Sequence, residues 1–272
     1  MKSMIPFTKM HGAGNDFIII DNRKNHIKPG ENSLIKKLCN RHLGIGADGL
    51  MLIDYKNPVH FRITYFNADG QPAEMCGNGA RCAIFFMQLV QPEITDFVFK
   101  VGDVEYSGFV TGINSVRVIW NEAPQIINRA GLGEIITPDF ERFAFVNSGV
   151  PHLVLQIKDN LDNIDICTWG PYYRQHVFFQ PAGTNVDFVE IADNKIHIRT
   201  FERGVEDETL SCGTGALAAA AAALDWGYLK LPVQIITQGG KLQVGLNEND
   251  KYWLEGPVQT VFEGKFSKSD FH

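Results

Sequence analysis

The sequence has no apolar run long enough to cross a membrane. A membrane-spanning helix needs roughly 18–20 apolar residues, whereas the longest apolar run, residues 216–224, is far shorter and mostly alanine. The first seven residues also lack the apolar core of a secretory signal peptide. We therefore expect a soluble, cytoplasmic protein with no membrane partner.

An excess of basic charge is missing as well. The chain has 25 lysines and arginines against 31 aspartates and glutamates, a formal net charge of −6. Nothing in this balance attracts nucleic acid, so we expect no nucleic-acid partner. Its 272 residues, with 44% hydrophobic and 21% charged residues, suffice for one large globular domain or two of ordinary size.

Paired metal-ligand motifs are absent too. The five cysteines are scattered, at Cys39, Cys76, Cys82, Cys167 and Cys212, and no Cys-x-x-Cys or His-x₃-His pair occurs. We therefore expect no metal site, and an odd number of cysteines at scattered positions does not suit a disulfide scaffold. The default for each is a buried, inert thiol, but two of the five lie in an unusual context.

That context is an internal repeat with a period of half the chain. Residues 62–67 lead to Cys-Gly-Asn-Gly-Ala from Cys76, and residues 198–203 lead to Cys-Gly-Thr-Gly-Ala from Cys212, 136 positions later. Further matches join three pairs of segments: 7–12 with 143–148, 15–17 with 151–153 and, at an offset of 137, 46–48 with 183–185. Two unrelated strand–turn–helix units are the alternative, but four regions in one register favour a duplication.

Each half is predicted to be a curved sheet around a buried helix. Residues 77–90 and 213–226 are apolar on nearly every side, which is typical of a buried helix. Runs of β-branched and aromatic residues between turn signals predict many short strands. These lie at 17–21, 50–54, 61–66, 97–101, 104–111 and 115–121, and then at 143–147, 153–158, 186–191, 196–201, 233–237, 241–246 and 252–255.

We therefore predict an α/β fold of two pseudo-symmetric lobes, each a curved, mostly antiparallel sheet wrapped round a central helix. The N-terminal lobe is expected to comprise residues 1–120 plus 258–272, with an outer helix at 32–41. The C-terminal lobe is expected to comprise residues 121–257. The active site is expected in the cleft between the lobes.

The two Cys-Gly-x-Gly segments place a thiol at a helix start. A helix start leaves backbone N–H groups without intrahelical partners and carries a partial positive charge, which suits a carboxylate. The same field lowers a thiol pKa from about 8.5 towards neutrality, so a thiol there can act as acid or base. Two facing lobes would put Cys76 and Cys212 on opposite sides of one substrate, which is the geometry that inversion of a stereocentre requires.

The motifs together resemble the diaminopimelate epimerase family, and the resemblance covers nearly the whole chain. They are Lys-Met-His-Gly-Ala-Gly-Asn-Asp-Phe at 9–17, Arg-His-Leu-Gly-Ile-Gly-Ala-Asp-Gly at 41–49, Phe-Asn-Ala-Asp-Gly at 66–70, Cys-Gly-Asn-Gly-Ala-Arg-Cys at 76–82, Glu-Arg-Gly at 202–204 and Glu-Thr-Leu-Ser-Cys-Gly-Thr-Gly at 208–215. The resemblance implies a two-lobed enzyme that interconverts LL- and meso-2,6-diaminopimelate for lysine and peptidoglycan precursor synthesis. It also implies independence from pyridoxal phosphate, with no cofactor, and a homodimer.

The resemblance assigns roles residue by residue. Cys76 and Cys212 would be the catalytic acid/base pair, and His152 and Glu202 would adjust the thiol pKa values. Substrate would be bound by Asn15, Asn67, Gly77, Asn78, Asn185, Glu202, Arg203, Gly213 and Thr214. Asn67 in a turn and Arg203 in a structural ion pair are the alternatives to substrate binding.

Three positions depart from the family pattern. Val150 stands where an asparagine is usual, the loop between Arg203 and Cys212 is one residue longer than in some relatives, and Phe262 stands where a dimer-interface tyrosine often occurs. The other functions to weigh are a proline or hydroxyproline racemase, a phenazine-type isomerase, a thiol redox protein and a non-catalytic amino-acid-binding module.

Overall fold

The computed structural model describes residues 3–137 and 139–271. Residues 1, 2, 138 and 272, which the predicted lobes include, lie outside this part. The chain divides into two compact units, Met1–Ile119 with Gly256–His272, and Trp120–Glu255. Within the described residues, no helix is both long and apolar enough to span a membrane.

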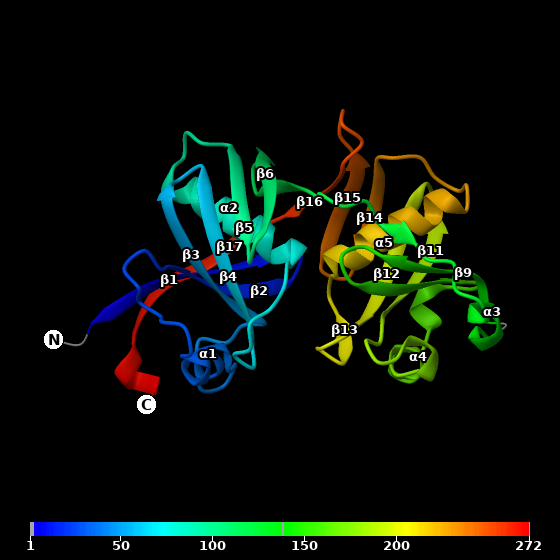
Figure 1. Ribbon diagram of the computed structural model, residues 1–272, viewed down its shortest axis with the longest axis horizontal. Coiled ribbons are helices and arrows are strands. Elements are labelled where there is room, and N and C mark those ends of the chain that lie inside the picture. The colour runs from blue at the N-terminus through cyan, green and yellow to red at the C-terminus, as the bar shows by residue number, and fades with distance from the viewer. Residues whose placement is uncertain (1–2, 138, 272) are drawn as a thin grey trace. The chain divides into compact units, whose positions relative to one another are not determined.

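The first unit is a single sheet curled round one helix, drawn from blue to green in Figure 1 with the C-terminal strand in red. Its strands run in the order β17-β1-β2-β3-β4-β5-β6-β7, and all pairings are antiparallel except β2–β3 and β4–β5. The strands are β1 (Met4–Gly12), β2 (Asn15–Asp21), β3 (Gly49–Asn57), β4 (His60–Asn67), β5 (Asp96–Val101), β6 (Val104–Gly112), β7 (Ser115–Ile119) and β17 (Gln259–Ser267). Helix α2 (Gly77–Val90) contacts β1, β2 and β3 as well as β6 and β7, so the sheet closes around it.

The second unit repeats this plan. The order is β8-β9-β10-β11-β12-β14-β15-β16, and the parallel pairings, β10–β11 and β12–β14, fall at the same two places. The strands are β8 (Gln125–Ile126), β9 (Phe140–Asn147), β10 (Pro151–Ile157), β11 (Asn185–Ala192), β12 (Lys195–Glu202), β14 (Val233–Thr237), β15 (Gly240–Leu246) and β16 (Tyr252–Pro257), and β13 (Asp207–Thr209) pairs with β12. Helix α5 (Gly213–Asp225) lies inside this sheet. The predicted fold class and the duplication are therefore confirmed.

The central helices are buried because their side chains are small or apolar. Residues 216–223 of α5 are seven alanines and one leucine, all at most 7% exposed. Alanine is the strongest helix former and needs little space, so strands can approach this helix closely from several directions. The predicted bounds of α2 are those observed, and α5 ends one residue earlier than predicted.

The structure corrects one part of the repeat alignment. The first hairpin pairs Gly12 with Asn15, and its counterpart pairs Asn147 with Pro151. The second turn therefore has three residues where the first has two, and Gly12 corresponds to Asn147 rather than to the predicted Ser148. The extra residue falls in the turn 148–150.

Outer helices cover part of each sheet. Helix α1 (Asn32–Cys39) shares a core with β1, β2 and β3, and helix α4 (Ile166–Arg174) shares one with β9 to β12. Strands β2 and β10 are thus covered on both faces, which explains their unbroken apolar runs. The other short elements are α3 (Leu132–Ile135), η1 (Leu161–Asn163), η2 (Val177–Phe179) and η3 (Lys268–Phe271).

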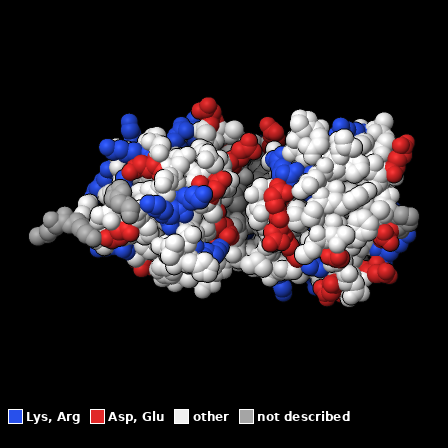
Figure 2. Space-filling model, turned by 90° about the horizontal axis from the view of Figure 1, so that it is seen from below, with Lys and Arg blue, Asp and Glu red and all other residues white. Residues whose placement is uncertain are grey.

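Surface charge is mixed on both units. On the face shown in Figure 2, acidic and basic side chains lie interspersed among uncharged ones rather than forming a broad basic field. This pattern accords with the slightly negative net charge.

Candidate active site

The two thiols occupy matching backbone positions. Cys76 is the N-cap of α2, with φ −116° and ψ 119°, and Cys212 is the N-cap of α5, with φ −115° and ψ 116°. Each cysteine's carbonyl accepts the first intrahelical hydrogen bond, from Ala80 at 2.8 Å and from Ala216 at 3.0 Å. The first N–H groups of both helices therefore lack partners within their helix and can bind an anion beside each sulfur.

Glycines inside both helix starts lie in close contact with a neighbouring strand. A Cβ on Gly79 would collide with the Met51 side chain of β3, and one on Gly215 would lie 2.6 Å from the Asp187 carboxylate of β11. Both positions let a neighbouring strand approach the first turn of the helix. The Gly-x-Gly spacing thus serves packing as well as exposing backbone N–H groups.

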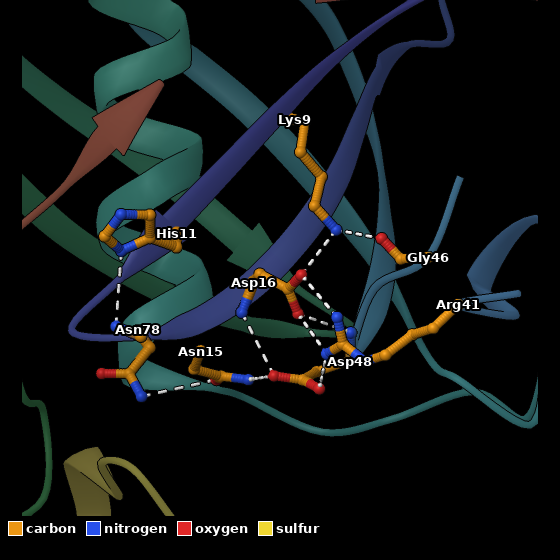
Figure 3. Close-up of polar contacts among 9 residues, drawn as sticks. Lys9, His11, Asn15, Asp16, Arg41, Gly46, Asp48 and Asn78 are labelled. Atoms are coloured by element: carbon orange, nitrogen blue, oxygen red, sulfur yellow. Dashed lines mark hydrogen bonds and ion pairs between the residues drawn. The ribbon is translucent and has the colours of Figure 1, made fainter. Parts of the chain in front are cut away.

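In the first unit, Asn15 lies against the thiol. The Cys76 thiol donates to the Asn15 side-chain oxygen, with Sγ···Oδ1 3.6 Å, and the Asn78 amide donates to the same oxygen at 3.4 Å. The Asn15 amide nitrogen donates to Asp48 at 2.7 Å (Figure 3). Three predicted site residues, Asn15, Cys76 and Asn78, are therefore brought together.

An ion network behind Asn15 fixes this arrangement. Asp16 pairs with Lys9 at 2.6 Å and with Arg41 at 2.8 Å, and Arg41 also pairs with Asp48 at 2.6 Å (Figure 3). Burial alone would raise the pKa of Asp16, but hydrogen bonds from Arg41 and Lys9 hold it well below its usual range. The network holds the backbone of Asp16, the residue after Asn15, against Asp48, to which the Asp16 N–H donates at 3.2 Å.

The hydrogen bonds of Asn67 tie it to the turn that follows β4. It ends β4 with an exposed side chain, and its backbone carbonyl accepts from Gly70 at 2.9 Å in the turn that follows. The turn role considered from the sequence is therefore present, and an exposed side chain remains available to a ligand.

In the second unit, a buried hydrogen-bonded chain leads to the other thiol. His152 Nδ1 lies 2.7 Å from Asp187 Oδ2, and both side chains are 0% exposed. His152 Nε2 lies 3.0 Å from the Thr214 hydroxyl, which lies 3.4 Å from Cys212 Sγ. A carboxylate can only accept, so in neutral His152 the Nδ1–H donates to Asp187 and Nε2 accepts from Thr214. The Thr214 oxygen is then free to accept from the Cys212 thiol.

These surroundings favour the protonated form of Cys212. Burial raises the pKa of the Cys212 thiol well above its ordinary value, and the carboxylates of Glu202 and Asp187 raise it further. Hydrogen bonding with Thr214 and with the Gly215 backbone acts in the opposite direction without overcoming this effect. Glu202 is therefore one of two carboxylates whose charge acts on this thiol.

Hydrogen bonds hold three further predicted site residues of the second unit, Asn185, Glu202 and Arg203. The Asn185 amide donates to the Pro151 carbonyl at 2.9 Å, and its oxygen accepts from the Arg203 backbone at 2.8 Å. The Arg203 guanidinium donates to the Ala182 carbonyl at 3.0 Å, and among the described residues it does not form the ion pair considered from the sequence. Glu202 accepts from the Thr209 hydroxyl at 2.9 Å.

Two buried charged residues near the thiols were not predicted, Asp187 and Arg81. Asp187 follows Asn185 by two positions on β11, so both side chains lie on one face of the strand. A charged residue between the apolar residues Val186 and Phe188 was the signal that could have identified it. Arg81 interrupts the apolar helix α2 in the same way.

Solved structures with the same two-unit fold cover nearly the whole chain. A phenazine biosynthesis protein of the PhzF family from Bacillus anthracis superposes with a TM-score of 0.73 at 14% identity, covering 97% of this chain and 99% of that one. A probable proline racemase from Agrobacterium radiobacter K84 superposes with a TM-score of 0.65, also at 14% identity, covering 97% and 93%. The chain therefore has the fold that PhzF proteins share with proline racemases.

Sequence comparison identifies the family within that fold. The family model described as diaminopimelate epimerase matches residues 7–116 and 144–261. The diaminopimelate epimerase of Hydrogenobaculum sp. is 43% identical, covering 97% of this chain and 99% of its own length, and that of Chlorobaculum tepidum is 42% identical, covering 94% and 98%. The chain belongs to the diaminopimelate epimerase family and is an isomerase, as the sequence motifs predicted.

Proposed function

We propose that the chain interconverts LL- and meso-2,6-diaminopimelate through a two-thiol acid/base reaction without a cofactor, in lysine and peptidoglycan precursor synthesis. The observation that carries this proposal is the pair of cysteines at matching helix starts in a duplicated fold. Membership of the family indicates diaminopimelate as the substrate. The duplication provides one acid/base group for each face of its α-carbon. We also propose that the protein acts in the cytoplasm and as a homodimer.

In the proposed reaction, the two units each contribute one thiol to a shared substrate. The Cys76 thiolate removes the α-proton from one face and becomes a thiol. The Cys212 thiol delivers its proton to the opposite face and becomes a thiolate. The reverse direction exchanges these roles, and solvent restores the starting protonation after product leaves.

The helix starts would stabilise the charge that develops when the α-proton leaves. The backbone N–H groups of Gly77, Asn78, Gly213 and Thr214 would hold the α-carboxylate, into which the carbanion charge spreads. Because these donors are fixed in place by the helices, they need no reorganisation during the reaction.

The other predicted residues would recognise the distal amino-acid end of diaminopimelate. Asn15, Asn67 and Asn185 supply amide donors and acceptors, Glu202 an acceptor and Arg203 a cation. Arg203 could grip the distal carboxylate with two parallel hydrogen bonds, which an ammonium group cannot do.

Conversion of LL-diaminopimelate with no added cofactor tests the proposed activity. We expect meso-diaminopimelate to accumulate, together with a matching change in optical rotation. Conversion of L-proline or trans-4-hydroxy-L-proline, with LL-diaminopimelate left unchanged, would instead indicate a proline or hydroxyproline racemase.

The pH dependence of kcat/KM should be bell-shaped. Turnover requires one thiolate and one thiol, so the rate rises as the pair loses its first proton and falls as it loses the second. Because burial raises the pKa of Cys212 well above its ordinary value, the alkaline fall should lie at a higher pH than the titration of an ordinary thiol. The forward and reverse reactions should give pH profiles of the same shape, because both use the singly protonated pair. The ratio of their kcat/KM values is fixed by the equilibrium constant. A rise to a plateau with no alkaline fall would remove the need for a protonated partner.

A further inference from the structure

A chain of hydrogen-bonded side chains in the second unit ends at the Cys212 thiol. The Asp187 carboxylate accepts from the Thr200 hydroxyl at 2.7 Å and lies 2.7 Å from His152 Nδ1. The Thr214 hydroxyl lies 3.0 Å from His152 Nε2 and 3.4 Å from Cys212 Sγ. His152 and Asp187 are both 0% exposed. Solvent does not reach the imidazole directly, so a proton reaches it through the groups that contact it.

Asp187 fixes the direction of the hydrogen bonds in this chain. A carboxylate only accepts, so the neutral imidazole carries its proton on Nδ1 and its Nε2 is an acceptor. The Asn185 amide nitrogen lies 3.5 Å from Nε2 and can also donate to it. When Cys212 is protonated, its thiol donates to the Thr214 oxygen and the Thr214 hydroxyl donates to His152. Every proton in the chain then points away from the sulfur and towards Asp187.

The proposed reaction requires Cys212 to be the base in one of its two directions, although the surroundings favour the thiol form. Burial raises the pKa of Cys212, and the carboxylates of Glu202 and Asp187 raise it further. Loss of the thiol proton to solvent would add a negative charge to a buried site, which is costly. A proton acceptor within the chain reduces this cost, because it gains a positive charge as the sulfur gains a negative one.

We propose that the Thr214 hydroxyl relays the Cys212 proton to His152 when Cys212 acts as the base, with Asp187 as the positioning residue of this relay. The S–H bond breaks as the thiol proton moves to Thr214 Oγ1, and the original hydroxyl proton moves to His152 Nε2. The result is a Cys212 thiolate and a His152 imidazolium, with no change in oxidation state. Cys76 keeps its own proton, so the two thiols together hold one proton, as turnover requires.

The relay is reset after the reaction. When product leaves, the imidazolium proton returns through Thr214 as Cys212 releases one to solvent, and Cys76 gains one from solvent. This inference rests on the proposed two-thiol function, but the relay itself lies entirely within the second unit.

Asp187 is placed to stabilise the relayed arrangement. Its carboxylate contacts His152 directly, whereas the imidazole and the Thr214 hydroxyl stand between it and the Cys212 sulfur along the chain. Coulomb interactions weaken with distance, so its attraction to the imidazolium should exceed its repulsion of the thiolate. In this arrangement His152 Nε2 donates to Thr214, whose hydroxyl donates to the sulfur, so each link of the chain is kept with its direction reversed.

Two carboxylates, Asp187 and Glu202, act on Cys212 from strands packed against α5. The other charged or titratable side chains described on those strands are engaged elsewhere, exposed or on the outer face. On β12, Arg199 pairs with Glu208 of β13 at 2.7 Å, on the face opposite Thr200. The rest are Lys195 and His197 on the same face of β12 as Arg199, Glu141 and Arg142 of β9, Glu190 of β11 and the exposed Lys241 of β15.

The first unit has different side chains at the matching place. Asn78 stands where the second unit has Thr214, and its amide donates to the Asn15 side-chain oxygen at 3.4 Å. Neither amide gains a proton near neutral pH. The relay is therefore expected for Cys212 and not for Cys76, although the two cysteines match in backbone.

The ultraviolet absorbance of the thiolate tests the relay in the full-length protein without substrate. The Cys76→Ala protein is titrated, and the titration of the Cys76→Ala/Cys212→Ala protein is subtracted, so the difference reports Cys212. Thr214→Val removes the hydroxyl but keeps the side-chain shape and the backbone N–H. We expect it to raise the Cys212 midpoint by about one pH unit, a tenfold loss of thiolate. Thr214→Ser keeps the hydroxyl and should stay within about half a unit of the parent protein.

Two variants that remove a negative charge should shift this midpoint in opposite directions. Asp187→Asn weakens the partner of the imidazolium and should raise the Cys212 midpoint. Glu202→Gln removes a carboxylate whose charge opposes the thiolate directly and should lower it. If Asp187 acted on the sulfur through space alone, its replacement would lower the midpoint too. Thr237→Val is the matched control and should change nothing, because that hydroxyl donates to the Gly240 carbonyl at 2.8 Å, outside the chain.

The pH profile of kcat/KM gives a second readout. Thr214→Val should move the acid limb to higher pH in both reaction directions, and Thr214→Ser should restore it. A lowered Cys212 midpoint in Asp187→Asn would overturn the relay. So would an unchanged midpoint in a Thr214→Val protein that circular dichroism shows to be folded, and this second result suffices if Asp187→Asn does not fold. Failure of the wild-type protein to convert LL-diaminopimelate would instead contradict the proposed function, and the Cys212 titration would still be measurable.

Discussion

Replacing either Cys76 or Cys212 with alanine is expected to abolish epimerisation in both directions. Each substitution removes the base for one direction and the acid for the other, so neither direction keeps a complete pair. Proton transfer by a positioned group is worth about 10²–10⁴-fold, and we expect a loss in kcat of at least about 10³-fold, or about 4 kcal/mol in the barrier.

The double variant and a third cysteine serve as controls. The losses should not add in the double variant, because the two thiols act as one unit. Cys167→Ala should retain wild-type activity, because Cys167 is exposed on the outer helix α4. The assay is conversion of LL-diaminopimelate and, separately, of meso-diaminopimelate. Substantial turnover with either catalytic cysteine replaced would contradict the assignment.

Asp187→Ala is expected to lower the free energy of unfolding by about 3 kcal/mol, because two buried donors lose their acceptor at a cost of about 1–3 kcal/mol each. Asp187 accepts from His152 and from the Thr200 hydroxyl, at 2.7 Å each, and all three side chains are at most 3% exposed. Removing the carboxylate leaves two buried donors without a partner. It also releases His152 from the orientation that leads through Thr214 to Cys212, so epimerisation should fall as well.

Urea unfolding of three variants measures this effect. Thr200→Val removes only one of the two hydrogen bonds and should cost about 1 kcal/mol. Asp159→Ala, at an exposed loop position, should change stability by less than about 0.5 kcal/mol. A loss for Asp187→Ala no larger than that for Thr200→Val would mean that the His152–Asp187 pair does not stabilise the second unit.

The sequence predicted the central helices and their cysteines because local signals agree there. An all-round apolar helix must be buried, and Gly-x-Gly after a cysteine marks its start, so the bounds of α2 could be read from residues 77 and 90. The duplication followed from spacing alone. The extra residue in the second hairpin did not, because a one-residue change in a turn leaves little trace in a gapless alignment.

Helix α4 and the Asp187–His152 pair could not be predicted from the sequence. Helix α4 contains Gly170 and Pro171, which ordinarily indicate a loop. It forms because Ile166 and Tyr173 are buried in the outer core and the Asp165 side chain caps its start. The contact between His152 and Asp187 joins residues 35 positions apart, and it depends on the parallel register of β10 and β11. Tertiary packing decides both features.

The central claim, that two thiols act on opposite faces of one α-carbon, is tested most directly by the fate of the transferred proton. In D₂O, starting from LL-diaminopimelate, early meso product should carry deuterium at the inverted centre while unreacted substrate stays largely unlabelled. This follows because the delivered proton comes from a thiol that has exchanged with solvent, and the removed proton stays on the other sulfur. The reaction started from meso-diaminopimelate should show the same asymmetry. Return of the substrate's own proton to the product in a single turnover would show that one base serves both faces, and would contradict the two-thiol account.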